Sequence, residues 1–394
     1  MPTITPQAGS GQVAKVVRIP ITNVLMDGNY TGVILAGTAK KPTNVILDTG
    51  SSALGLDGTV YNPGADRNAK TTNMVQAVEY RSGSWLGAVV HTDIAGGSGT
   101  QAVSLKQVSV AVAYAESSDM FGKANGILGL AYTRLDAAYT MPGATWPPKY
   151  NYNQIQQQGR VTFLEPYFTE LEAQGAVANK FAFYTRRSMI RMTTPNPASD
   201  AFNQGFLLLG GGEESKDLYS GVFQSVAILD DEWYCTNLKA VLVGDSEPIE
   251  IPPPTKASTL LTNSIVDSGT NSLLLDDALF ETIAKRLSSG QDKSLTLAIR
   301  SGYLPMSSLK LAEWPVITFV LQGSGGDVKL AVSPENYWQT DAPEKGYACA
   351  AIMSDNGQLK GRSILGLPLM NGYFTIFDRS MNKGLGVIKF APRK

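Results

Sequence analysis

Two short stretches of the sequence end an apolar run with an aspartate. In VILDTGSS this residue is Asp48, and in SIVDSGTN it is Asp267. A hydroxyl residue and a glycine follow in both. Either stretch alone is typical of a turn after a strand, because Asp and Gly are common turn residues. Two such copies predict instead a pair of carboxylates, which could act together as general acid and general base.

A second pair of similar stretches accompanies the aspartates. NGILGL occupies residues 125–130 and RSILGL occupies residues 362–367. Each follows one aspartate stretch, so two unlike motifs recur in the same order. Such a repeat indicates two related structural units. We therefore expect an N-terminal lobe over 1–216 and a C-terminal lobe over 217–394, joined where Gly and charged residues replace the apolar pattern.

The composition of the 394 residues favours an all-β fold with a few short helices. There are 39 Gly and 21 Pro residues, and Val, Thr, Ser and Tyr are frequent, as in short strands joined by tight turns. The net charge is −1, from 33 Lys and Arg against 34 Asp and Glu. No overall field would attract nucleic acid or an anionic membrane, and we expect neither as a partner.

Apolar runs bounded by turn residues predict strands throughout the chain, among them AKVVRIPI, TGVILAG, LGAVVHTDI, FLLLGGG, WPVITFVLQ and YFTIFDR. Helical periodicity is present over 165–177 and 275–290. Asp276 or Asp277 would suit the N-cap of the second helix, and Gly290 its end. Three segments are expected to be loops, residues 138–159, 191–205 and 250–259.

The first of these loops, 138–159, is long and rich in aromatic residues. It could be a functional surface feature or a tolerated surface insertion, and the sequence favours neither interpretation. Cys235 and Cys349 are the two cysteines, and we expect free buried thiols. His91 is the single histidine and lies among strand-forming residues, which favours a structural role over a catalytic triad.

With these motifs, the chain resembles the pepsin family of two-lobed aspartic peptidases from about residue 13 to residue 392. The likeness includes NGILGLAY, LLLGGG, YFTIFDR and GLGVIKFAP. It implies two β-barrel-like lobes with a cleft between them and a catalytic aspartate from each, Asp48 and Asp267. It also implies supporting roles beside the two aspartates for Thr49, Gly50, Ser51, Ser268, Gly269 and Thr270.

A pair of carboxylates in such a cleft has a definite chemistry. Two carboxylates about 3 Å apart would repel by roughly 5 kcal/mol at an effective dielectric of about 20. The pair is therefore expected to hold one shared proton over a wide acidic range. The ionised acid can then activate a water molecule while the protonated one assists the scissile carbonyl. This chemistry requires neither metal nor cofactor, and we expect none.

Between the first two motifs, residues 78–90 predict a hairpin with an exposed tip. By resemblance it is a mobile flap over the cleft, in which Tyr80, Arg81 and Ser82 contact the substrate. Three positions depart from the family pattern. Gly55 replaces a tryptophan that usually anchors the flap, a place Trp85 could take. Arg81 replaces a common glycine. Leu367 replaces a frequent aspartate, so one hydrogen bond near the dyad is expected to be missing.

The resemblance implies a monomeric, pepstatin-sensitive endopeptidase that cleaves extended peptides at acid pH between bulky apolar residues. The alternative is a catalytically silent relative that binds a protein partner through the cleft or the loop over 138–159. The N-terminus shows no signal sequence and no long apolar run is present. We therefore expect similarity to bacterial members without signal peptide or pro-segment and a cytoplasmic location, with a secreted mature form as the alternative.

Overall fold

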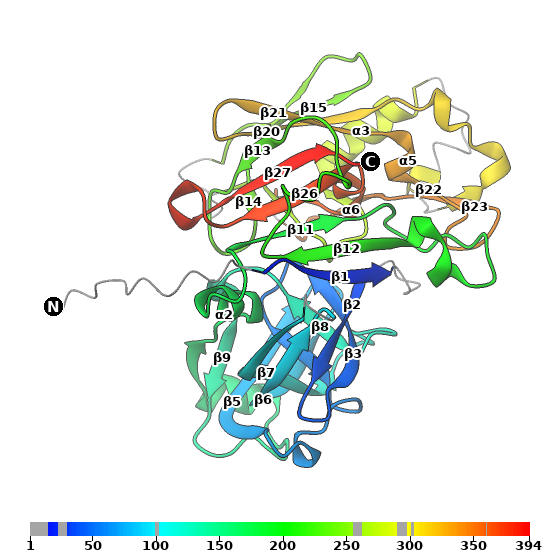
Figure 1. Ribbon diagram of the computed structural model, residues 1–394. Helices are drawn as coiled ribbons and strands as arrows, with labels where there is room; N and C mark the ends of the chain where they lie inside the picture. The colour runs from blue at the N-terminus through cyan, green and yellow to red at the C-terminus, as the bar shows by residue number, and fades with distance from the viewer. Residues whose placement is uncertain are drawn as a thin grey trace.

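The computed structural model describes residues 15–22, 30–98, 102–254, 262–289, 298–300, 303–359 and 361–394. These residues form a two-lobed, mainly β structure with a few short helices (Figure 1). The expected all-β, bilobal fold is thus confirmed. No helix among the described residues is long and apolar enough to cross a membrane.

The N-terminal lobe belongs to a sheet of 15 described strands, which continues into the C-terminal half. The strand order is β10-β9-β5-β6-β7-β4-β8-β3-β2-β1-β12-β11-β26-β27-β13. The strands from the first half are β1 (Val17–Thr22), β2 (Thr31–Ala36), β3 (Lys41–Asp48), β4 (Leu54–Asp57), β5 (Lys70–Tyr80), β6 (Gly83–Gly96), β7 (Val103–Glu116), β8 (Gly126–Gly129), β9 (Ala137–Thr140), β10 (Arg160–Phe163), β11 (Lys180–Tyr184) and β12 (Gln204–Leu209). The remaining strands are β13 (Gln224–Ala227), β26 (Tyr373–Asp378) and β27 (Val387–Pro392).

The C-terminal lobe contains three smaller sheets. The first has the order β14 (Cys235–Thr236), β17 (Ser264–Val266), β25 (Ser363–Leu365), β18 (Leu273–Leu275) and β24 (Ile352–Ser354). The second has the order β16 (Ile249–Glu250), β15 (Leu238–Val243), β20 (Ile317–Gln322) and β21 (Asp327–Val332). The third has the order β19 (Tyr303–Pro305), β23 (Tyr347–Ala350) and β22 (Trp338–Thr340).

The helices are short compared with the sheets (Figure 1). The described α-helices are α1 (Tyr152–Gln158), α2 (Tyr167–Ala173), α3 (Asp277–Leu287), α5 (Pro334–Tyr337) and α6 (Leu367–Met370). The described 3₁₀ turns are η1 (Pro63–Ala65), η3 (Thr133–Leu135), η4 (Pro197–Ser199), η5 (Ala201–Asn203), η6 (Met306–Ser308), η7 (Leu311–Glu313) and η8 (Asn382–Gly384).

Both predicted helices are confirmed as α2 and α3. Asp276 is the N-cap of α3, and its side chain accepts a hydrogen bond from the Ala278 N–H at 3.1 Å. Gly290, expected to end this helix, lies outside the described residues. The quoted apolar runs form strands, as predicted.

The prediction of a continuous loop over 138–159 is wrong. Strand β9 occupies its start and helix α1 its end. Asn151 and Gln154 form a reciprocal capping box at the start of α1, with hydrogen bonds of 3.0 and 2.9 Å. This local signal outweighs the Pro- and Gly-rich residues before it. The segment over 191–205 contains η4 and η5 and runs into β12, and part of 250–259 lies outside the described residues.

The predicted internal repeat is visible in the strand pairing. In the first half, β3 pairs parallel to β8, and β4 pairs antiparallel to β8. In the second half, β17 pairs parallel to β25, and β18 pairs antiparallel to β25. Each aspartate stretch therefore lies beside its own Ile-Leu-Gly stretch, as the order of the motifs indicated. The lobe boundary at 216 stays a prediction.

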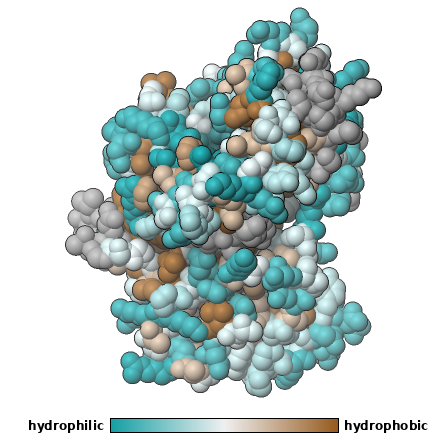
Figure 2. Space-filling model, turned by 90° about the vertical axis from the view of Figure 1, so that its right-hand side faces the viewer, coloured by the Kyte–Doolittle hydropathy of each residue, from teal (hydrophilic) through white to brown (hydrophobic). Residues whose placement is uncertain are grey.

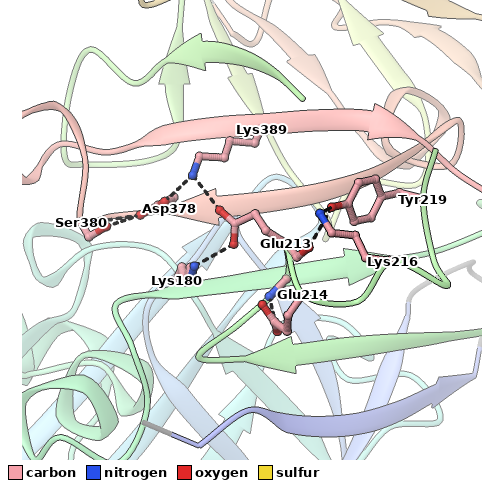
Figure 3. A network of polar contacts seen from close by, with 9 residues as sticks. Lys180, Glu213, Glu214, Lys216, Tyr219, Asp378, Ser380 and Lys389 are labelled. Atoms are coloured by element: carbon pink, nitrogen blue, oxygen red, sulfur yellow. Dashed lines mark hydrogen bonds and ion pairs between the residues drawn. The ribbon is translucent and has the colours of Figure 1, made fainter. Parts of the chain in front are cut away.

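Four strands, two from the middle of the sequence and two from its C-terminal part, connect the two lobes. β11 pairs with β12 and with β26, and β26 pairs with β27, so the neighbouring strands β12 and β11 lie beside the last two strands of the sequence (Figure 1). Figure 3 shows polar contacts on this sheet. Lys389 donates to Glu213 at 2.8 Å and to Asp378 at 2.7 Å, and Lys180 donates to Glu213 at 2.7 Å. Partial burial raises the pKa of Glu213, but these two lysines lower it to about 2.

Most hydrophobic side chains lie in buried clusters, and the surface shows few of them together. On the face in Figure 2, hydrophobic residues occur in small groups between hydrophilic ones. The largest core contains residues of both halves, from Leu47 and Leu128 to Leu365 and Phe377. Since the same core includes strands of both lobes, their packing is coupled.

The buried side chain of Arg379 connects this core to the end of β8. Its guanidinium donates to the carbonyl oxygen of Ala131 at 2.7 Å and to the Tyr234 hydroxyl at 2.6 Å. It also donates to the carbonyl oxygen of Leu130 and lies 4.4 Å from the centroid of the Tyr132 ring. A buried cation is stable here because carbonyl and hydroxyl oxygens surround it.

We expect Arg379→Met to lower the free energy of unfolding by about 3 kcal/mol or more, because buried oxygens would lose their charged donor. Urea denaturation of the purified protein measures this change. Arg67→Met replaces an exposed arginine and is the matched control, with an expected change within about 0.5 kcal/mol. Equal stability of the two variants would contradict the prediction.

Candidate active site

The two predicted aspartates lie in loops of the same construction. Asp48 ends β3 and Asp267 follows β17. The Gly50 N–H donates to Asp48 Oδ1 at 2.7 Å, and the Gly269 N–H donates to Asp267 Oδ1 at 2.8 Å. The two hydroxyls predicted to support the aspartates occupy equivalent places: Ser51 Oγ donates to Asp48 Oδ2, and Thr270 Oγ1 donates to Asp267 Oδ2 at 2.6 Å.

Reciprocal hydrogen bonds hold the two loops together. The Thr49 N–H donates to Ser268 Oγ at 3.0 Å, and the Ser268 N–H donates to Thr49 Oγ1 at 2.8 Å. Each hydroxyl in turn donates to a carbonyl oxygen of the opposite half, Thr49 to Val266 at 3.3 Å and Ser268 to Leu47 at 2.9 Å. Thr49 and Ser268 are fully buried, so water does not compete with these bonds.

The glycines at these loops are required by space. A Cβ atom at Gly50 would lie 2.7 Å from Asp267 Oδ1, and one at Gly269 would lie 2.3 Å from Asp48 Oδ1. Both distances are too short for a carbon and an oxygen that are not bonded. Each glycine therefore makes room for the carboxylate of the opposite lobe, and the aspartates come within hydrogen-bonding reach of each other.

Burial and proximity determine how the pair ionises. Asp48 is 5% exposed and Asp267 is 6% exposed. Burial raises the pKa of Asp48, and the Asp267 carboxylate raises it further. The hydrogen bonds from Ser51 and Gly50 oppose this shift by stabilising the ionised form. The pair therefore keeps a proton at a pH where an isolated aspartate would have lost it.

The predicted hairpin is formed by β5 and β6. Tyr80 pairs with Gly83, so Arg81 and Ser82 form the two-residue tip. Gly83 has φ +154°, a conformation that L side chains rarely adopt. The Ser82 carbonyl oxygen accepts a hydrogen bond from Ser118 Oγ at 2.9 Å, which connects the tip to the end of the neighbouring β7.

Trp85 takes the space left by Gly55, as expected from the sequence. A Cβ atom at Gly55 would lie 3.0 Å from the Trp85 ring, which is 1% exposed. Burial raises the pKa of Tyr80, and Asp48 adds to this shift, whereas Ser51 and Trp85 oppose it. Among the described residues, the buried Tyr80 hydroxyl and the Trp85 Nε1–H lack a standard hydrogen-bond partner.

A cleft of about 790 Å³ contains both aspartates and the hairpin tip. Arg81 crosses this cleft, because its Nε–H donates to Gln358 Oε1 of the C-terminal lobe at 3.0 Å. Arg81 thus places a positive charge over the cleft. The apolar residues that line the cleft are Met120, Ile265, Leu274, Met353, Leu359 and Ile364.

Two further residues of the cleft were missed by sequence reasoning. The Trp233 Nε1–H donates to the carbonyl oxygen of Gly50 at 3.0 Å, and the Arg362 guanidinium lies over the Trp233 ring, 5.0 Å from its centroid. Trp233 gave no sequence signal, because its partner is 183 residues away. Arg362 directly precedes the SILGL stretch, and its position beside a motif was the available signal.

The other candidates from the sequence lie outside this cleft. Leu367 is fully buried, and its N–H donates to the Thr270 carbonyl oxygen at 2.9 Å. His91 is in β6, with its Nδ1 3.4 Å from Ser109 Oγ. Cys235 and Cys349 are buried free thiols, as predicted. In the part of the chain that the structure describes, no cluster of three or more His, Cys, Asp or Glu side chains could hold a metal.

Comparison with known proteins agrees with this geometry. The family model described as eukaryotic aspartyl protease matches residues 29–391. Beta-secretase of Strongylocentrotus purpuratus is 25% identical over 89% of this chain, which spans 64% of that relative's length. Pepsin A of Sus scrofa is 24% identical over 92% of this chain and 82% of its own length. Cathepsin D of Chionodraco hamatus is 25% identical over 91% of this chain and 80% of its own length. The chain therefore belongs to the eukaryotic aspartyl protease family, a family of aspartic-type peptidases.

Proposed function

We propose that this protein is an aspartic endopeptidase that hydrolyses peptide bonds in extended polypeptides at acid pH. One observation supports this above all: Asp48 and Asp267 are held side by side by two equivalent loops. Burial of both carboxylates would be costly without a role that uses their proximity. The retained hydroxyls and glycines beside them support the same conclusion.

In the proposed mechanism, the ionised carboxylate of the pair accepts a proton from a water molecule between the two aspartates. The resulting hydroxide attacks the carbonyl carbon of the peptide bond. The protonated carboxylic acid donates a hydrogen bond to the carbonyl oxygen, and a proton then passes to the leaving nitrogen. Ser51 and Thr270, which donate to the Oδ2 atoms, restrict where the shared proton can lie.

The hairpin around Tyr80 is proposed to act as a flap. Its tip already reaches the opposite lobe through Arg81 and Gln358, so it can cover a peptide in the cleft. The Tyr80 side chain lines the cleft and could contact that peptide. An extended chain under the hairpin would be held by its main chain, as in other strand-like recognition.

The proposed preference for bulky apolar residues follows from the lining of the cleft. Apolar side chains such as Ile265, Leu274 and Met353 line the cleft that contains the dyad, where they can contact apolar side chains of a bound peptide. Inhibition by pepstatin and a monomeric state remain part of the proposal. A cytoplasmic location and similarity to bacterial members stay predictions.

The proposed activity is tested with Asp48→Asn and Asp267→Asn. Each substitution should lower kcat on denatured protein or an apolar fluorogenic peptide by about 10³-fold or more, because the pair loses either its base or its shared proton. The assay is run between about pH 3 and 6, with and without pepstatin. An inert wild type would favour the alternative, a silent relative that binds a protein partner, and undiminished activity of either variant would exclude the dyad.

The raised pKa of Asp48 predicts the alkaline limit of activity. As pH rises through this pKa, the pair loses its last proton and kcat should fall. Ser51→Ala removes a hydrogen bond that lowers the pKa of Asp48, so the alkaline limb of the pH profile should move to higher pH. Ser324→Ala, an exposed control, should leave the limb in place. A shift of the Ser51→Ala limb to lower pH would contradict this assignment.

Tyr80→Ala should lower kcat/KM by about 10- to 100-fold, because the flap would no longer position the peptide. The protein should still fold, since Tyr80 lies near the tip of a hairpin and is only partly buried against the cluster around Trp85. Tyr152→Ala, at a tyrosine 51% exposed in α1, is the matched control. Unchanged kinetics of Tyr80→Ala would mean that the hairpin is not a flap.

A further inference from the structure

Arg362 is the cation on the C-terminal wall of the cleft. Its guanidinium lies over the Trp233 ring, 5.0 Å from the centroid, and both residues line the cleft with the two aspartates. Stacking holds a guanidinium flat against an aromatic face and leaves its edge N–H groups free to donate. The Arg362 Nε–H is buried and has no hydrogen-bond partner among the described residues.

The position of this guanidinium is fixed relative to the dyad. Trp233, on which it stacks, donates to the carbonyl oxygen of Gly50 in the Asp48 loop. Arg362 also directly precedes β25, whose Leu365 carbonyl oxygen accepts a hydrogen bond from the Asp267 N–H at 3.2 Å. Arg362 lies three positions before Leu365 in the sequence, which corresponds to about 10 Å along an extended strand. An extended peptide covers this distance in about three residues.

Within the described part of the chain, Arg362 has no carboxylate as an ion-pair partner. No Asp or Glu of the described residues forms an ion pair with Arg362 or with Arg81, the second cation that lines the cleft. Glu79 and Asp119 also line it, but they belong to β5 and to the segment after β7 in the N-terminal lobe. An arginine in a groove without its own carboxylate favours an anion from outside.

We propose that Arg362 and Trp233 form a subsite for an acidic side chain of the substrate, within about three residues of the cleaved bond. This inference rests on the proposed peptidase function and adds a specificity to it. The carboxylate of a substrate Glu or Asp accepts hydrogen bonds from the edge of the Arg362 guanidinium. Trp233 keeps the guanidinium oriented toward the peptide and is a positioning residue.

The substrate for the test is an apolar fluorogenic peptide that carries one Glu. The Glu is placed in turn at each of three positions on either side of the cleaved bond, and each peptide is paired with its Gln counterpart. Assays at about pH 5 keep the Glu side chain mostly ionised, because its pKa is near 4.3. At one position the wild type should show a kcat/KM about tenfold higher for Glu than for Gln.

Arg362→Met should abolish this Glu/Gln ratio, and Arg362→Glu should reverse it in favour of a Lys peptide. The ratio is measured within each variant, so a general loss of activity does not affect it. Arg160→Met, an exposed arginine of β10 outside the cleft, should keep the wild-type ratio. Arg81→Met should also keep it, since Arg81 already donates to Gln358.

The outcomes separate this inference from the proposed function. Cleavage of Glu and Gln peptides at equal rates at every position, or a ratio that survives Arg362→Met, overturns the subsite while the peptidase activity stands. If no peptide is cleaved, the proposed function fails. In that case the affinities of the same Glu and Gln peptides are measured by fluorescence anisotropy. Tighter binding of the Glu peptide by the wild type, but not by Arg362→Met, supports the subsite, and equal affinities overturn it.

Discussion

Two buried carboxylates side by side cannot both stay ionised, because their repulsion and the loss of hydration act in the same direction. The loops of this protein keep such a pair together all the same. Glycines at positions 50 and 269 leave room for the opposite carboxylate, and the Thr49 and Ser268 hydroxyls join the loops. The pair avoids a double negative charge by retaining one proton, and its chemistry depends on that proton.

The constraint also explains why the fold has two equivalent halves. Each aspartate is presented by a strand that runs parallel to an Ile-Leu-Gly strand, β3 beside β8 and β17 beside β25. Equivalent supports give each carboxylate the same set of donors. The differences between the halves lie further out, in the hairpin on one wall and in Trp233 and Arg362 on the other. The dyad is thus symmetric, whereas the walls that meet a substrate are not.

The sequence predicted what is encoded locally and repeated. Asp48 and Asp267, their neighbours and the hairpin around Tyr80 could be recognised because each lies within one short motif that occurs twice or resembles a family pattern. Trp233 and Arg379 could not, since their partners, Gly50 and the carbonyl oxygens of Leu130 and Ala131, are distant in the chain. Helix α1 was missed because Pro and Gly before it outweighed the Asn151 cap in our interpretation. Long-range contacts of this kind need the fold before they can be seen.

The sheet that joins the lobes has a consequence for the order in which the protein is made. β11 and β12 emerge from the ribosome long before β26 and β27, which contain the last strand-forming residues of the chain. Until then the edge of β11 that later binds β26 is open. This sheet connection between the lobes therefore forms only after β26 and β27 have been made, and until then the growing chain has no finished sheet to hold its cleft in place.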